Sequence, residues 1–208
     1  MAKKGLWILF GLLSVVVGLY PTIYLFAERK FGILESKSTE LLANILWNVG
    51  FYMHISFGGI ALLIGWTQFI SKIRIYKPKI HTQIGKIYVV SVLLSSITGI
   101  FIGFFATGGL VASLGFICLS TTWLYTTVMG YISIRNQKIY EHQKMMVYSY
   151  AACFAAVTLR IWLPILTIYF GNFVTAYRIV AWLSWVPNLI VAYLFTRLFI
   201  KHELPAPG

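Results

Sequence analysis

The chain has 208 residues, of which 59% are hydrophobic and only 11% are charged, and its mean hydropathy is +0.81. A water-soluble domain carries about 25% charged residues, so this composition excludes an ordinary soluble protein and indicates a lipid bilayer as the solvent. The net charge of +12 would suit a nucleic-acid binder, but no nucleic-acid-binding motif is present, and we expect no nucleic-acid partner.

Six apolar runs are each long enough to cross about 30 Å of hydrocarbon as a helix. They predict an all-α integral membrane bundle of six transmembrane helices, forming a single membrane domain over 1–208. The first run resembles a signal peptide but is too long for one, so we expect a retained span that Pro21 kinks. The expected spans are 5–27, 42–70, 87–106, 110–134, 145–170 and 179–200.

The basic residues lie mainly on one side of the expected bundle. Twelve of the 17 Lys and Arg residues fall at one set of span ends and four at the other. The segment 72–86 alone holds five bases and no acid. Because basic loops are retained in the cytoplasm, we predict that both termini and this segment are cytoplasmic.

Local signals predict how some of these spans begin and pack. Ser38 is expected to cap the second span, with Glu40 in its first turn. The Thr-Gly-Gly sequence at 107–109 predicts a tight turn that joins the third and fourth spans into a hairpin. Gly99 and Gly103 are four residues apart, which is typical of a face for close helix packing.

Two polar residues lie deep inside apolar runs. His54 and Arg160 are each about ten residues from the outer end of their span, which is roughly 15 Å deep at about 1.5 Å per residue. A mid-membrane Arg costs roughly 2.5–3.5 kcal/mol on insertion scales, and no expected span contains a carboxylate. The counter-charge must then come from a loop Glu, helix carbonyls, a lipid headgroup or an anionic ligand. We predict that Arg160 points inward and shares with His54 a polar cavity that is open to the outer face. Pro164 lacks the N–H that would bond to the Arg160 carbonyl, so this carbonyl is a further acceptor in the cavity. The alternatives are an Arg160 side chain that snorkels to the membrane surface and a His54 ring that is hydrogen-bonded inside the bundle.

A second pair of histidines lies near the cytoplasmic ends of two spans. His81 and His142 are expected at similar depth, and two neutral imidazoles facing one gap can ligate a haem iron. Gly85 follows His81 by four residues, and Gly58 follows His54 by four, so each glycine leaves bare backbone on the face of its histidine. The sequence therefore offers a site for b-type haem at His81, His142 and Gly85, although interfacial histidines also serve as simple polar anchors.

Several short stretches resemble one family. They are HISFGG at 54–59, HTQIGKIY at 81–88, Trp123, HQKMM at 142–146 and AAVTLR at 155–160. Together they resemble the bacterial predicted membrane proteins catalogued as domain of unknown function 2306, over roughly 50–170. The resemblance implies a multi-pass protein of the bacterial cytoplasmic membrane, with a four-helix functional core at about 42–170, and implies no particular activity.

The chain is also similar, more distantly, to the ascorbate-dependent transmembrane diheme cytochromes b. In order and spacing, His54, His81 and His142 look like three of the four haem ligands of those proteins. The fourth ligand is missing from the 121–127 region, so the similarity implies haem only at the His81–His142 pair.

Three hypotheses follow for function, and none specifies an enzyme. The first is electron transfer through one b-type haem, with a quinone or another redox partner. The second is binding or transport of an anionic lipid, quinone or small ligand at His54, Arg160 and Trp123. The third is a structural or assembly role without chemistry.

Overall fold

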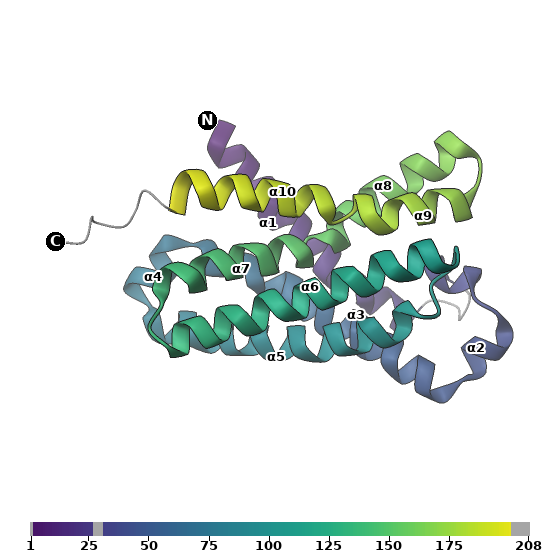
Figure 1. The fold of residues 1–208 in the computed structure, drawn as a ribbon, viewed down its shortest axis with the longest axis horizontal. Helices are drawn as coiled ribbons and strands as arrows, with labels where there is room; N and C mark the ends of the chain where they lie inside the picture. Colours follow the sequence, from purple (N-terminus) through teal and green to yellow (C-terminus); the bar gives the residue numbers. More distant parts are fainter. Residues whose placement is uncertain (1, 27–30, 201–208) are drawn as a thin grey trace.

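The computed structural model describes residues 2–26 and 31–200, and over these residues the fold is all-α (Figure 1). Six helical segments of the described chain are long and apolar enough to cross a membrane, which confirms the predicted bundle. Glu28 and the tail 201–208 lie outside the described residues. The elements are α1 (Ala2–Leu19), η1 (Tyr20–Leu25), η2 (Gly32–Ser36), α2 (Thr39–Ala43), α3 (Ile45–Gly65), η3 (Trp66–Phe69), α4 (Ser71–Tyr76), α5 (Pro78–Gly103), α6 (Leu110–Arg135), α7 (Ile139–Cys153), α8 (Ala155–Phe170), α9 (Phe173–Leu183), α10 (Val186–Phe195) and η4 (Thr196–Ile200).

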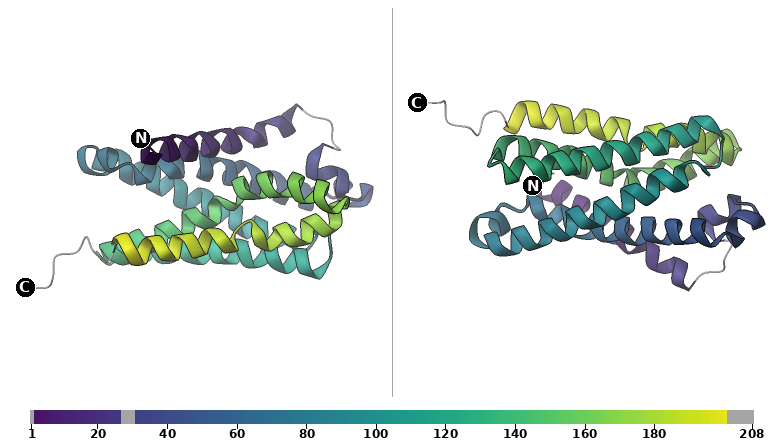
Figure 2. Two further views of the ribbon diagram at one scale, coloured as in Figure 1. Left: turned by 90° about the horizontal axis from the view of Figure 1, so that it is seen from above. Right: turned by 60° about the horizontal axis from the view of Figure 1, so that its bottom comes forward.

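The bundle has two distinct ends. α1 begins and α10 leads out at the same end as α4, which we call the terminal end (Figures 1 and 2). The short elements η2 and α2, the turn between α5 and α6, and the turn between α8 and α9 lie at the opposite end, which we call the loop end. If the basic segment 72–86 is cytoplasmic as predicted, the loop end faces outward.

Small residues bring the central helices together. α3 packs along α5, α5 along α6, and α6 along α7. A Cβ atom added to Gly103 would lie 2.8 Å from Ile117 Cγ1 of α6, so the predicted close-packing face is confirmed. The turn to α6 is also confirmed, because Gly108 and Gly109 have φ values of +102° and +72°, which side chains disfavour.

The first span changes form where Pro21 was expected to kink it. The α-helix α1 ends at Leu19 and continues as the 3₁₀ segment η1. Just before this change, the backbone of Gly18 lies against that of Gly59 in α3: a Cβ on Gly59 would lie 2.7 Å from the Gly18 carbonyl oxygen and 2.9 Å from Pro21 Cγ. This contact holds η1 over the middle of α3.

The second span begins differently from the prediction. Ser38 caps the separate short helix α2, accepting a hydrogen bond from the Leu41 N–H at 3.3 Å. The span itself starts at Asn44, whose side-chain oxygen accepts from the Trp47 N–H at 3.0 Å. The Asn48 amide donates to the carbonyls of Leu42 and Asn44, at 2.8 and 2.7 Å, and so satisfies the acceptors left at the break.

The third span also begins earlier than its apolar run. α5 starts at Pro78, nine residues before the predicted start at 87, because Pro78 suits the first turn of a helix and the polar segment simply continues it. His81 and Gly85 are therefore inside α5.

The last two spans are each broken near their middle. The fifth divides at Phe154 into α7 and α8, and the sixth divides at Ser184 and Trp185 into α9 and α10. Pro187 accounts for the second break, because it has no N–H to donate to the Leu183 carbonyl. Neither break was predicted from the apolar runs.

Polar side chains join the two breaks. The Thr158 hydroxyl and the Asn188 amide both donate to the Ser184 carbonyl, the latter at 3.0 Å. Asn188 also donates to the Ala151 carbonyl at 3.3 Å. Backbone acceptors freed inside a membrane are costly unless they are bonded, so these contacts stabilise two broken helices at one depth.

Candidate functional site

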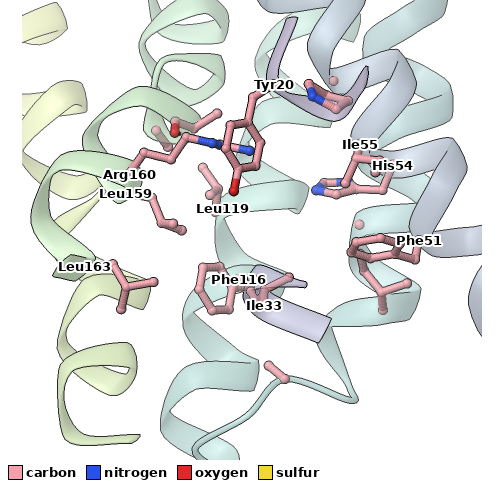
Figure 3. A pocket seen from close by; sticks show the side chains of 18 of the residues that line it. Tyr20, Ile33, Phe51, His54, Ile55, Phe116, Leu119, Leu159, Arg160 and Leu163 are labelled. Carbon is pink, nitrogen blue, oxygen red and sulfur yellow. Dashed lines mark hydrogen bonds between the residues drawn. The ribbon is translucent and has the colours of Figure 1, made fainter. Parts of the chain in front are cut away.

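A cavity of about 660 Å³ occupies the loop-end half of the bundle. Its walls come from η1, α3, α5, α6 and α8, with η2 and the start of α9 closing its loop-end side. Lining residues of α3 and α8 lie on either side of this cavity. Most of the wall is apolar, so the predicted polar cavity is instead an apolar one with few polar groups; the labelled apolar residues of Figure 3 are Ile33, Phe51, Ile55, Phe116, Leu119, Leu159 and Leu163.

Arg160 points from α8 into this cavity (Figure 3). Its Nη1 donates to the Ala156 carbonyl of its own helix at 2.8 Å, and its Cζ lies 4.3 Å from the centroid of the Tyr20 ring. Its Nε is buried and has no hydrogen-bond partner among the described residues. The next residue, Ile161, and Ile168 are lipid-facing, at 44% and 84% exposed, so α8 turns Arg160 inward and its apolar face outward.

No acid of the described chain forms an ion pair with Arg160; the ion pair that is present joins Lys144 and Glu141 on α7. A guanidinium keeps its charge at any physiological pH. In this apolar surrounding the Ala156 carbonyl and the Tyr20 ring are therefore its stabilising partners, and part of its donor capacity remains unused.

His54 faces Arg160 from the opposite wall, on α3 (Figure 3). Its Nδ1 lies 2.8 Å from the Ser95 carbonyl oxygen, and the Ser95 hydroxyl in turn donates to the His54 carbonyl at 2.9 Å. A carbonyl oxygen only accepts, so this contact assigns the proton to Nδ1 and leaves Nε2 as an acceptor. Gly99 makes room for the ring, because a Cβ there would lie 2.8 Å from Nδ1.

Trp123 forms part of the cavity floor and connects it to a buried polar cluster. Its Nε1 donates to the Tyr88 hydroxyl at 3.4 Å, and that hydroxyl lies 2.8 Å from Ser149 Oγ. Ser149 Oγ is also 2.6 Å from Thr127 Oγ1, which lies 2.7 Å from the Trp123 carbonyl. These bonds tie α5, α6 and α7 together directly beneath the cavity.

Lys37 lines the loop-end side of the cavity, just after η2. Its Nζ donates to the Phe105 carbonyl at 2.6 Å and to Thr107 Oγ1 at 3.0 Å, and Ser36 Oγ lies 2.9 Å from the same Thr107 hydroxyl. Burial lowers the pKa of Lys37 to about 8. The η2 segment is thus fastened across the cavity to the turn between α5 and α6.

The histidines proposed for haem lie elsewhere, towards the terminal end. Neither His81 nor His142 lines the cavity. His142 Nδ1 lies 2.8 Å from the Gly130 carbonyl oxygen, which leaves its Nε2 as an acceptor, whereas His81 Nδ1 is buried without a hydrogen-bond partner among the described residues. A Cβ on Gly85 would meet only Gln68 Oε1, at 3.5 Å.

The structure therefore brings His54, Arg160 and Trp123 to one cavity and keeps His81, His142 and Gly85 apart from it. Sequence reasoning missed Tyr20 and Lys37, both of which lie outside the expected core at 42–170. Tyr20 directly precedes Pro21, and that position was the available signal, since a proline that changes the helix form also re-aims the side chains beside it.

A comparison with family sequence models matches residues 51–196. No curated protein and no solved structure matches the chain. The matched region contains His54, Trp123 and Arg160 but begins after η1 and η2. It therefore includes lining residues from four of the five wall elements, α3, α5, α6 and α8, and omits η1 and η2. Because the match extends over well more than half of the chain, the protein belongs to the predicted membrane protein family DUF2306.

Proposed function

We propose that this multi-pass membrane protein binds a small amphipathic molecule from the bilayer, with the polar head of that molecule at Arg160. The observation that carries the proposal is the buried guanidinium whose Nε has no partner and whose charge meets no carboxylate of the described chain. Burying such a donor is costly unless an acceptor reaches it. An oxygen-bearing head group supplies that acceptor.

The shape and lining of the cavity support an amphipathic ligand. A volume of about 660 Å³ is within the usual range of small-molecule pockets, which are mostly apolar with few polar groups. The cavity reaches Ile168, which is 84% exposed on the outer face of α8. An apolar tail can therefore extend between the cavity and the lipid without crossing the polar loops.

Extraction of the purified protein tests the proposal. Organic extracts of detergent-solubilised protein, analysed by mass spectrometry, should contain an amphiphile in stoichiometric amounts, and Arg160→Leu should lose most of it. Arg197→Leu is the matched control, because Arg197 is exposed on η4, remote from the cavity. Equal amounts in all three preparations would contradict the proposal.

The second candidate is a b-type haem between His81 and His142, for electron transfer. It is favoured by the Gly130 carbonyl, which orients His142 with Nε2 free for a metal, and by His81 Nδ1, which is buried without a hydrogen-bond partner among the described residues. Purified protein should then show a Soret band that His81→Ala and His142→Ala weaken and that His54→Ala leaves intact. Colourless protein from haem-replete cells would rule the haem out.

A further inference from the structure

The two facing walls of the cavity carry complementary hydrogen-bonding groups. Arg160 offers donors only, and its Nε is unpaired among the described residues. His54 offers an acceptor, because its Nδ1 proton is used on the Ser95 carbonyl and Nε2 is turned to the cavity (Figure 3). A head group that satisfies both must accept at one edge and donate at the other.

The rest of the lining selects for a flat head group. Aromatic rings from four different elements surround the space between the two walls: Tyr20, Phe51, Phe116 and Trp123 from η1, α3 and α6, and Tyr177 from α9. Aromatic rings favour the faces and edges of other rings. A simple carboxylate meets the Arg160 donors but leaves His54 Nε2 facing an anion.

From these observations we infer that the ligand is a lipid-soluble para-quinol. One ring oxygen accepts from Arg160, the opposite hydroxyl donates to His54 Nε2, and the apolar tail leaves past Ile168. The inference rests on the proposed function and narrows it to one ligand class. It concerns binding of the reduced form and assigns no electron-transfer step.

Calorimetric titration of the full chain in detergent, without oxygen, tests this with three probes whose alkyl tails have nine or ten carbons: 2-decyl-1,4-benzoquinol, the corresponding quinone, and decanoate. The quinol should bind at least about tenfold more tightly than the quinone, whose two carbonyls cannot donate to His54, a difference of about 1.4 kcal/mol. It should also bind more tightly than decanoate. Arg160→Leu should weaken binding of the quinol by a further tenfold or more.

Two substitutions of His54 separate its two nitrogens. In His54→Asn the amide nitrogen takes the place of Nδ1, so the bond to Ser95 remains and the Nε2 acceptor is lost; quinol affinity should fall about tenfold. In His54→Gln the amide oxygen takes the place of Nε2, and quinol affinity should stay within about threefold.

The outcomes distinguish the two proposals. If decanoate binds in an Arg160-dependent way and quinol binds no more tightly than quinone, the quinol assignment is overturned. The proposed binding of an amphipathic molecule at Arg160 would still be supported. Equal effects of His54→Asn and His54→Gln on quinol affinity would also overturn the assignment. No Arg160-dependent binding of any probe would overturn both.

Discussion

Single hydroxyl groups add hydrogen bonds between the central helices, and Ser149 is the clearest example. It bonds to Tyr88 of α5 and Thr127 of α6 while sitting on α7. We expect Ser149→Ala to lower the free energy of unfolding by about 0.5–1.5 kcal/mol, because Tyr88 is left buried with only the long Trp123 contact. Unfolding in mixed micelles measures this difference.

Ser96→Ala is the matched control for that substitution. Ser96 is equally buried, but its hydroxyl bonds to the Val92 carbonyl of its own helix at 2.6 Å. That carbonyl keeps its normal backbone partner when the hydroxyl is removed, so Ser96→Ala should be close to neutral. If both substitutions lower the free energy of unfolding equally, the hydrogen bonds between helices contribute no more to stability than a bond within one helix.

For single residues, the sequence predicts a place in the cavity well where a polar side chain interrupts an apolar run. His54 and Arg160 are conspicuous because they interrupt apolar runs, and the physical cost of burying them implies an inward-facing site. Tyr20 and Lys37 carry no such contrast: one is an ordinary aromatic at a span end and the other an ordinary loop lysine. Their roles arise from tertiary contacts made across the cavity, which local sequence does not encode.

At the scale of elements, η2 behaves as a cover held by a lysine of unusual chemistry. Burial lowers the pKa of Lys37 to about 8 from an ordinary value of 10.5. Between these two values the undocked lysine binds more protons than the docked one, so the docked state gains stability as the pH rises. The neutral amine still has two N–H donors for Phe105 and Thr107.

We therefore expect the Tm of the wild-type protein to rise relative to that of Lys37→Met between pH 7 and pH 9.5. Comparing the two proteins at each pH removes the contribution of the other titrating groups. A difference in Tm that is the same at both pH values would show that Lys37 is not desolvated when η2 is docked.

The helix boundaries that the sequence predicts well are those marked by glycine, proline or a turn. The 110–134 run was predicted almost to the residue because glycines and a turn bound it at one end, and α6 is Leu110–Arg135. The breaks at Phe154 and Ser184 escaped prediction, because a run of apolar residues reads the same whether its helix is whole or divided. Pro187 was a usable signal for one of them.

For the whole molecule, the distribution of bases predicts the direction of insertion. Twelve bases fall at one set of the expected span ends, the set that includes the segment 72–86, and four at the other. Reporter fusions after Gly208 and within the turn at Gly109 should therefore read cytoplasmic and external, respectively. An external signal at Gly208 would require the opposite orientation or a different number of spans, and would place the cavity on the cytoplasmic side.

The contact between Gly18 and Gly59 has a consequence for the molecule as a whole. Both residues at this crossing are glycines, so no Cβ atom separates the two backbones. The chain continues from Gly18 into η1, whose first residue, Tyr20, lies against Arg160. The direct contact of the two backbones therefore determines the width of the cavity between the first, second and fifth spans. A single methyl group at position 59 would force the first span outward, so this glycine, which also lines the cavity, sets how far apart the walls around Tyr20 and His54 lie.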